Sequence, residues 1–301
     1  MTGGLPRGAA MAGAQENVMR EFAGKTAFIT GGASGIGLAL GRAFAAAGAR
    51  VMLGDIEPEA LTAAIASLKG AGATVDGVVC DVTDPASVDK AAEATRGAFG
   101  KIHIVCNNAG VGGGSGAESI SLETWRWVLD VNLMGVLHGI RAFVPHILAH
   151  GEGGHIVNTA SMAGMISGLG FSPYTASKFA VVGMSEGLAQ ELAPRGIGVT
   201  VICPGFVRTR IHESQRNRPQ RYGPARVPAP GSRGSALMAE IAALVRGGID
   251  PAHVAAQVLD AIREDRLYVF THPEMRAEAE QRFARILRAM ETPDAAPPTR
   301  P

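Results

Sequence analysis

Residues 30–37 read Thr30-Gly31-Gly32-Ala33-Ser34-Gly35-Ile36-Gly37 and join a strand-like apolar run, Thr26–Thr30, to a helix-like segment, Gly35–Ala47. Small residues at such a junction let backbone N–H groups approach a pyrophosphate at the N-terminus of the helix. In a chain with 40 Gly, about 0.6 matches to this glycine spacing are expected by chance, so the position of the stretch carries the argument. The stretch predicts a dinucleotide-binding turn between a strand and a helix.

Strand-like and helix-like patterns alternate along the rest of the chain. Further strands are expected at Arg50–Asp55, Thr74–Asp81, Ile102–Asn107, His155–Ser161, Gly198–Pro204 and Leu267–Thr271. Helices are expected at Pro58–Lys69, Pro85–Phe99, Leu122–His150, Tyr174–Ala193 and Pro251–Glu264, with a further helix near the C-terminus. Because the strands are short and apolar and each crossover carries a helix, the sheet should be parallel and covered on both faces. We predict an α/β fold with one doubly wound sheet that binds its ligand at the carboxyl ends of the strands.

Composition favours one large core over two small ones. The chain has 301 residues, of which 47% are hydrophobic and 18% charged. We expect a disordered extension over residues 1–20, one folded domain over 21–291 and a disordered Pro-rich tail over 292–301. Within the domain, residues 208–248 break the alternation with many Pro, Gly and Arg, which indicates a substrate lid.

Charge and cysteine usage point to a small-molecule ligand in a reducing compartment. The net charge of +1 supplies no field that would hold nucleic acid or anionic lipid, so neither is expected as a partner. Cys80, Cys106 and Cys203 form no CxxC pair, and no continuous apolar run approaches membrane-spanning length. We therefore expect reduced thiols and a cytoplasmic protein with no membrane contact. The His residues show no metal-ligand spacing, so no catalytic metal is expected.

The end of the second strand indicates the choice of cofactor. Asp55 lies eighteen residues beyond Gly37, where a carboxylate can accept hydrogen bonds from both hydroxyls of an adenosine ribose and would repel a 2′-phosphate. Ser34 and Ile56 add no positive charge there. These residues favour NAD over NADP. The alternative interpretation is that Asp55 is an ordinary turn residue.

The third and fourth strands end beside the first. Asp81-Val82 follows the third strand, and the Asp81 carboxylate can reach an adenine amino group. Asn108-Ala109-Gly110 follows the fourth, and this stretch is small and polar enough to lie against the adenosine ribose. Taken alone, either would be read as a turn.

Tyr174-Thr175-Ala176-Ser177-Lys178 places a phenol and an ammonium four residues apart, on one face of a helix. With three Tyr and five Lys in the chain, about 0.05 such pairs are expected by chance. The positive charges of Lys178 and of a bound nicotinium ring should lower the pKa of Tyr174 toward neutrality. This pair is the predicted proton-transfer unit.

Two further polar residues can complete the set. Ser161, at the end of the fifth strand, can donate a hydrogen bond to a substrate carbonyl oxygen while the Tyr174 proton moves. Asn132 is a poor helix former in the middle of a predicted helix. It is either a buried side chain that positions a water for Lys178 or a solvated residue.

Together these motifs resemble the short-chain dehydrogenase/reductase family, in its compact single-domain branch, over about residues 22–290. The resemblance implies a Rossmann-type sheet of seven strands and hydride transfer between nicotinamide C4 and an alcohol or ketone carbon. It also implies catalysis by Asn132, Ser161, Tyr174 and Lys178, with Lys178 holding the nicotinamide ribose. Pro204-Gly205-Phe206-Val207-Arg208-Thr209 resembles the turn under the nicotinamide, where the Val207 backbone and Thr209 would hold the carboxamide. A homotetramer or dimer is likewise implied.

Several alternatives remain open. The residues Trp125, Val128, Leu129, Leu133, Val136 and Leu137 form a stripe that we interpret as core packing. Met162, Met165, Ile166, Leu169 and Phe171 would either wall an apolar substrate pocket or form a buried loop. The seven Arg between Arg208 and Arg233 oppose only Glu213, which indicates a solvated, mobile loop or a clamp for an anionic substrate. A nonenzymatic NAD-binding redox sensor is the alternative function, although it would not need the Tyr, Ser and Lys set.

Overall fold

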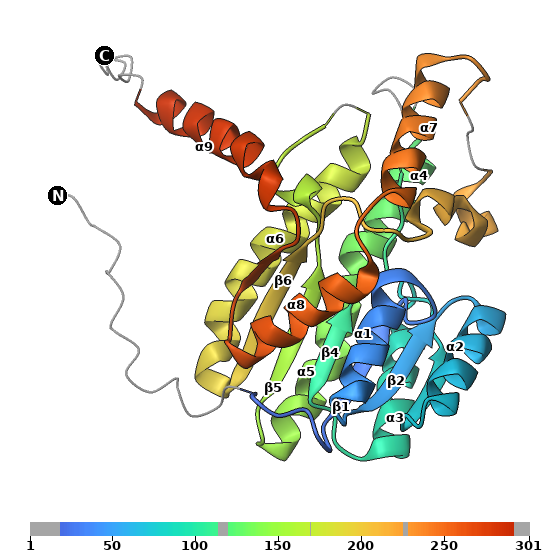
Figure 1. Ribbon diagram of the computed structural model, residues 1–301, viewed down its shortest axis with the longest axis vertical. Coiled ribbons are helices and arrows are strands. Elements are labelled where there is room, and N and C mark those ends of the chain that lie inside the picture. The colour runs from blue at the N-terminus through green and yellow to red at the C-terminus, as the bar shows by residue number, and fades with distance from the viewer. Residues whose placement is uncertain (1–18, 114–119, 169, 225–227, 292–301) are drawn as a thin grey trace, which may run out of the picture.

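The structure is a computed structural model that describes residues 19–113, 120–168, 170–224 and 228–291. Its centre is a seven-stranded parallel sheet with strand order β3-β2-β1-β4-β5-β6-β7 (Figure 1). The strands are β1 Thr26–Thr30, β2 Arg50–Asp55, β3 Val75–Val79, β4 Ile104–Asn107, β5 Gly154–Thr159, β6 Ile197–Cys203 and β7 Tyr268–Phe270. The predicted doubly wound α/β sheet is therefore confirmed.

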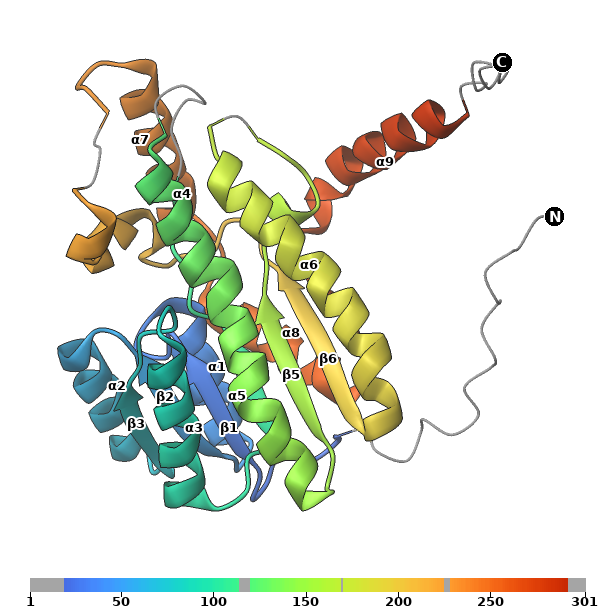
Figure 2. The same cartoon turned by 180° about the vertical axis from the view of Figure 1, so that it is seen from behind.

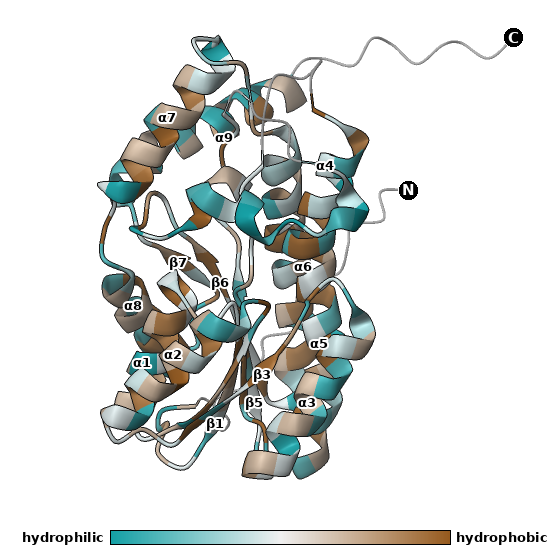
Figure 3. Ribbon diagram, turned by 90° about the vertical axis from the view of Figure 1, so that its right-hand side faces the viewer, coloured by the Kyte–Doolittle hydropathy of each residue, from teal (hydrophilic) through white to brown (hydrophobic). Residues whose placement is uncertain are grey.

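Helices cover both faces of this sheet. The α-helices are α1 Gly35–Ala46, α2 Pro58–Gly70, α3 Pro85–Phe99, α4 Leu122–Leu129, α5 Gly135–His150, α6 Ser172–Leu192, α7 Arg233–Arg246, α8 Pro251–Arg263 and α9 Arg276–Met290. The helices α1, α2 and α8 lie on one face, while α3, α5 and α6 lie on the other (Figures 1 and 2). Apolar residues gather along the sheet and on the helix sides turned toward it (Figure 3). This is the pattern expected when both faces of a parallel sheet are buried.

The edge strand β3 is shorter than the sequence predicted. The expected run Thr74–Asp81 is reduced to Val75–Val79, and Val79 is 54% exposed. The Cys80 N–H still donates to the Asp55 carbonyl of β2 at 2.9 Å, but the Asp81 N–H bonds to the Ser87 hydroxyl at 3.0 Å instead. An edge strand pairs on one side only, so its end is readily captured by a local turn.

The predicted helix Leu122–His150 is interrupted by a π-helical turn over Asp130–Met134. Trp127 and Val131 are buried in the core, and beyond the inserted residue the helix faces are rotated, so that Leu137, which we assigned to the core stripe, is 41% exposed. The predicted stripe is therefore wrong at Leu137, because a spacing rule for one continuous α-helix cannot anticipate a π turn.

The stretch Leu122–His150 is long and apolar enough to cross a membrane by length and composition, contrary to the expectation that no apolar run approaches that length. Nearly half of its most apolar window, 44%, is buried inside the protein. Its residues Trp127, Phe143 and Ile147 pack in the core beneath the sheet. A buried core helix of an α/β protein can therefore meet the length and composition criteria for a membrane span.

The predicted lid contains regular structure. Two 3-10 segments, η5 Ile211–Asn217 and η6 Gln220–Tyr222, precede α7, a helix that the sequence analysis did not predict. Helix α7 lies beyond the carboxyl ends of the strands, and α9 projects from the body (Figures 1 and 2). Of the predicted terminal extensions, residues 1–18 and 292–301 lie outside the described part of the chain, while Met19 packs against the core.

Candidate active site

A cavity of about 450 Å³ lies at the carboxyl ends of the strands. Most of the predicted site residues line it: Gly31, Ser34, Gly35, Ile36, Asp55, Ile56, Asp81, Val82, Asn108, Ala109, Gly110, Ser161, Tyr174, Lys178, Pro204, Gly205, Val207 and Thr209. Gly37 and Asn132 are not part of its lining. The tertiary structure thus brings together residues from six strand ends and the lid.

The glycine turn forms a close-fitting cradle at the start of α1. Gly31 and Gly35 have φ values of +63° and +52°, which favour glycine. A Cβ on Gly37 would lie 2.1 Å from the Gly31 carbonyl oxygen, so only glycine fits there. The N-cap residue Ser34 makes no side-chain cap bond, which leaves N–H groups of the first helical turn to bind an anion. A dinucleotide pyrophosphate fits this set of donors.

Asp55 is buried at the end of β2 beside this turn. Its Oδ2 accepts from the Ala33 N–H at 2.9 Å and its Oδ1 from the Glu57 N–H at 3.0 Å. Burial raises the pKa of Asp55 above its usual value, and these two bonds oppose the shift. Among the described residues, no Lys or Arg pairs with Asp55. Each carboxylate oxygen keeps acceptor capacity for a ribose hydroxyl.

Asp81 already has protein partners at the end of β3. Its Oδ2 accepts from Arg221 Nη2 at 2.9 Å, and its Oδ1 accepts from the Thr83 hydroxyl at 2.7 Å. Although burial opposes the shift, these bonds hold the pKa of Asp81 below its usual range. An adenine amino group would therefore share this carboxylate with Arg221.

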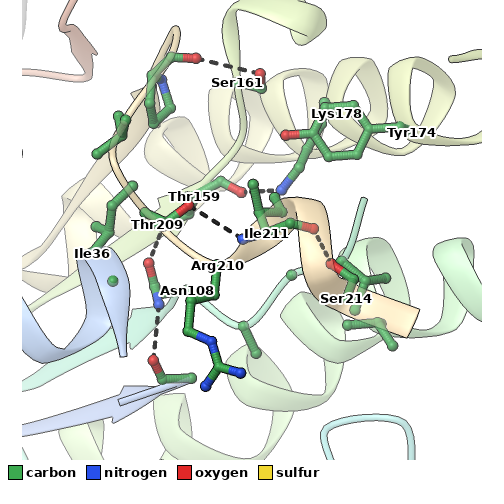
Figure 4. A pocket seen from close by; sticks show the side chains of 18 of the residues that line it. Ile36, Asn108, Thr159, Ser161, Tyr174, Lys178, Thr209, Arg210, Ile211 and Ser214 are labelled. Atoms are coloured by element: carbon green, nitrogen blue, oxygen red, sulfur yellow. Dashed lines mark hydrogen bonds between the residues drawn. The ribbon is translucent and has the colours of Figure 1, made fainter. Parts of the chain in front are cut away.

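The Asn108 side chain braces the sheet. Its Nδ2 donates to the Thr30 carbonyl at 3.0 Å. Its Oδ1 accepts from the hydroxyl of Thr159, which lies beside Asn108 in Figure 4, at 3.4 Å. The Thr30 hydroxyl in turn accepts the N–H groups of Asn108 and Ala109. These bonds hold the backbone of Ala109 and Gly110 at the cavity wall.

Tyr174 and Lys178 lie one turn apart on α6 (Figure 4). Lys178 is 2% exposed, its Nζ donates to the Thr159 carbonyl at 2.8 Å, and this nitrogen lies 5.5 Å from the centre of the Tyr174 ring. Burial lowers the pKa of Lys178 to about 8. The ammonium is therefore still mostly charged at neutral pH.

The pKa of Tyr174 differs from the expectation. Burial raises it above its usual value, and only the hydrogen bond with Ser161 acts in the opposite direction. The protein alone therefore does not lower it. Desolvation penalises the phenolate, and the Lys178 ammonium donates to the Thr159 carbonyl.

Ser161 lies between Tyr174 and the Pro204 turn. Its hydroxyl donates to the Pro204 carbonyl at 3.3 Å and accepts from the Ala163 N–H at 3.1 Å. The long bond to Pro204 is weak, so the proton is readily redirected to a ligand oxygen.

Asn132 is fully buried within the π turn, so the solvated alternative is wrong. Its Oδ1 accepts from the Val111 N–H at 2.8 Å, and its Nδ2 donates to the Val111 carbonyl at 3.0 Å and to the Ser177 hydroxyl at 3.2 Å. Both amide protons are thus in use. A Cβ built on Gly110 would lie 3.4 Å from Asn132 Oδ1 and 3.6 Å from Lys178 Nζ, so the two groups flank one small space.

The Pro204–Thr209 segment lines the cavity with its backbone held from behind. The Arg208 N–H donates to the Ile249 carbonyl at 2.9 Å, and the Ile249 N–H donates to the Phe206 carbonyl at 3.0 Å. Because alternate residues of an extended segment face opposite sides, the N–H and C=O of Val207 face away from Ile249. Because Val207 lines the cavity, these two groups are candidates to bond a carboxamide there.

One wall of the cavity is apolar. Met162, Ile166 and Phe171 line it from the segment after β5, and Ile211, Ile241 and Val245 line it from η5 and α7. Met165 packs against another core cluster instead, and Leu169 lies outside the described residues. The contribution of α7 was not expected, because residues 208–248 showed no helical pattern.

Most lid arginines are paired within the protein, as neither sequence interpretation anticipated. Acidic partners are Asp250 for Arg208, Glu213 for Arg210, Glu57 for Arg216 and Asp81 for Arg221. Arg218 donates to the Tyr222 and Gly223 carbonyls and lies over the Trp127 ring. These guanidinium groups therefore do not form an open clamp for an anion.

One cluster outside the cavity has metal-ligand composition: His103, His150 and Glu152. The His103 ring bonds to the Thr26 N–H and to Glu152, while the His150 ring bonds to the Ile102 carbonyl and the Glu152 N–H. All four ring nitrogens are engaged, so the cluster is a hydrogen-bond network that joins loops at the amino end of the sheet.

Comparisons with known proteins agree with this geometry. Residues 25–220 match the family model described as short chain dehydrogenase. The 1-deoxy-11-beta-hydroxypentalenate dehydrogenase of Streptomyces avermitilis is 37% identical over 265 residues, which cover 87% of this chain and 90% of that protein. A short-chain dehydrogenase/reductase from Burkholderia phymatum, solved with NAD, is 40% identical with a TM-score of 0.86 and covers 90% of this chain and 97% of that one. An actinorhodin polyketide ketoreductase variant solved with NADPH is 29% identical with a TM-score of 0.70, covering 82% and 95%.

Proposed function

The chain belongs to the short-chain dehydrogenase/reductase family, and from that premise we propose that it interconverts a bulky, apolar secondary alcohol and its ketone with NAD. The dehydrogenase relatives support oxidation or reduction of a hydroxyl group, and the similar structure solved with NAD supports a nicotinamide cofactor. The redox-sensor alternative is not supported. The observation that carries the proposal is the convergence of Ser161, Tyr174 and Lys178 on one cavity with the glycine turn.

The bound nicotinamide would supply the hydride acceptor or donor. Tyr174 would take the hydroxyl proton in oxidation and return it in reduction, while the Ser161 hydroxyl donates to the substrate oxygen as its charge develops. The raised pKa of Tyr174 favours its protonated form, so the residue is ready to act as an acid in ketone reduction. In the oxidation direction, the positive charge of the oxidised ring would act with Lys178 to favour the tyrosinate.

Lys178 would serve two roles from one buried position. Its ammonium lies within reach of a ribose in the cavity and beside the Tyr174 ring. The small space that it shares with Asn132 Oδ1 would hold a water that passes protons between Tyr174, Lys178 and solvent. Asn132 would then act through its remaining lone pair and by holding the Val111 backbone.

NAD is the proposed cofactor because Asp55 is the nearest charge to the expected ribose. Its two oxygens have acceptor capacity for the ribose hydroxyls, and a 2′-phosphate would meet a buried carboxylate. Arg216 is the nearby cation that could offset this repulsion, and Glu57 already pairs with it at 2.8 Å. Neutralising a phosphate would require breaking that pair.

The substrate class follows from the apolar wall. Met162, Ile166, Phe171, Ile241 and Val245 line the same cavity as Tyr174, and Arg216 and Arg221 are paired with acidic residues. A ring-sized hydrocarbon body would displace water from this surface, whereas a carboxylate would find Arg210 and Arg216, the described arginines of the cavity lining, already paired with acidic residues. This favours neutral alicyclic or aryl alcohols over sugar acids or hydroxy acids.

The test is a panel of neutral alicyclic and aryl secondary alcohols, matched with hydroxy acids of similar size, followed by NADH absorbance. Turnover of the neutral members with at least about tenfold higher kcat/KM is expected, equivalent to roughly 1.4 kcal/mol. Preference for the acids would refute the substrate class. Absence of turnover with every alcohol and ketone would refute the proposed reaction.

Assembly, domain organisation and location are also proposed. We propose a homo-oligomer, tetramer or dimer, in which the exposed Met134 and Leu137 are covered by a second copy; light scattering on the purified chain tests this. We further propose that residues 21–291 fold as one unit with 208–248 as its lid, and that the protein is cytoplasmic. The buried thiols Cys80, Cys106 and Cys203 support a reducing environment.

A further inference from the structure

His272 follows the last strand of the sheet and lies behind the Pro204–Thr209 segment. Strand β7 ends at Phe270, so His272 sits at the carboxyl edge, beside the end of β6. The side chain is buried, with 8% exposed, and it is not part of the cavity lining. It therefore touches the cavity only through the residues in front of it.

The imidazole of His272 binds two consecutive residues of that segment. Its Nε2 lies 3.1 Å from the Phe206 carbonyl oxygen, and its Nδ1 accepts from the Gly205 N–H at 3.2 Å. A carbonyl can only accept, so the proton is on Nε2 and Nδ1 is the acceptor. In this tautomer the ring accepts from the Gly205 N–H and donates to the Phe206 carbonyl at the same time.

The neighbouring residues reinforce this contact. The Thr271 hydroxyl lies 2.7 Å from His272 Nδ1 and 3.3 Å from the Gly205 nitrogen. A Cβ on Gly205 would come within 2.6 Å of the His272 ring, so the absence of a side chain at residue 205 permits the close approach. On the other side, the Phe206 carbonyl also accepts from the Ile249 N–H.

The segment that His272 holds reaches two parts of the active site. The Pro204 carbonyl accepts from the Ser161 hydroxyl at 3.3 Å and from the Met162 N–H at 2.8 Å. The N–H and C=O of Val207 face away from Ile249, and Val207 lines the cavity where a carboxamide would bind. Displacement of Gly205 and Phe206 would therefore move the nicotinamide contacts and Ser161 together.

We propose that His272, supported by Thr271, is a positioning residue that holds the Pro204–Val207 backbone where it binds the nicotinamide end of the cofactor. This inference rests on the proposed function. It predicts a defect confined to the nicotinamide half of the dinucleotide. The glycine turn and Asp55, at the other end of the cavity, do not contact His272.

The test compares two ligands, NADH and ADP-ribose, which share the adenosine and pyrophosphate but differ in the nicotinamide. The variant His272→Phe keeps a ring of similar size and removes both hydrogen bonds to the turn. Calorimetry should show NADH binding weakened by about tenfold, with ADP-ribose binding changed by less than about twofold. His253→Phe, an exposed position on α8, is the matched control and should leave both dissociation constants unchanged.

A conservative variant separates positioning from packing. The Oδ1 atom of His272→Asn can still accept from the Gly205 N–H, so this variant should recover part of the NADH affinity. If His272→Phe does not fold, Thr271→Val decides, because it removes one partner of His272 Nδ1 and should show the same selective loss at smaller size.

Equal weakening of NADH and ADP-ribose, or unchanged NADH affinity, would overturn the positioning role. A wild-type chain that binds neither ligand would instead refute the proposed function.

Discussion

Arg216 and Glu57 are separated by 159 positions in the sequence, yet their side chains form a salt bridge with Nη2 and Oε1 2.8 Å apart. Asn217 Nδ2 donates to the same carboxylate oxygen at 2.9 Å. Although burial opposes the shift, these bonds hold the pKa of Glu57 below its usual value. Because Glu57 follows β2 and Arg216 lies in η5, the pair ties the proposed lid to the proposed adenosine end of the cavity.

Breaking this pair should release the cofactor faster. Both side chains are about a quarter exposed, at 25% and 27%, so Arg216→Gln should raise the NADH dissociation rate by about threefold rather than by orders of magnitude. Glu57→Gln should give the same result, and the double variant should add little to either single one. Stopped-flow NADH release measures the rates, with Arg96→Gln, which breaks an exposed pair on α3, as the control. Fully additive effects would show that the two residues act separately.

Tyr174→Phe should abolish turnover while NADH still binds. The change removes only the oxygen that exchanges the proton and keeps the ring that packs on α6 beside Lys178. Steady-state rates and NADH titration on the same preparation provide the two readings. Retention of more than a few per cent of activity would contradict the proposed acid and base.

Lys178→Met should weaken cofactor binding and shift the acidic limb of alcohol oxidation, where the rate rises with pH, to higher pH, because it removes the positive charge beside Tyr174. Its effect on stability should depend on pH in a defined direction. The pKa of Lys178 is lowered to about 8 by burial, so between about 8 and its unfolded value the unfolded chain binds more protons and the wild type gains stability as pH rises. The variant lacks this gain. Melting temperatures from pH 6 to 10 should therefore favour the variant most at low pH, and a constant difference would contradict the buried ammonium.

Asp55 should control the choice between the two nicotinamide cofactors. We expect NAD to be preferred over NADP by at least about tenfold, or roughly 1.4 kcal/mol. Asp55→Asn keeps an acceptor for the Ala33 N–H or the Glu57 N–H but removes the charge, so NADP should gain and NAD should lose affinity. Ratios of kcat/KM for the two cofactors test this. Equal use of both by the wild type would refute the role of Asp55.

Most of the fold and most of the reacting groups could be predicted from local sequence motifs. The alternation of short apolar strands with helices predicted the parallel sheet, because strand and helix periodicities are properties of neighbouring residues. Likewise, the four-residue spacing of Tyr174 and Lys178 predicted one helical face, and both residues line the same cavity as Asp55. The structure differs from these predictions at two places, the π turn over Asp130–Met134 and the helix α7. The local sequence pattern predicted neither of them.

The sequence by itself thus determined the order of elements, the glycine cradle and the identity of the groups that can move a proton. Only the tertiary structure decided their environment and their distant partners. Burial lowers the pKa of Lys178 and raises that of Tyr174, and desolvation depends on everything packed around a group. The contacts of Arg216 with Glu57 and of His272 with Gly205 join segments 159 and 67 positions apart, and no periodic pattern encodes such pairs. They exist because the parallel sheet collects the ends of all its strands at one edge, which brings side chains from distant parts of the chain within hydrogen-bonding distance.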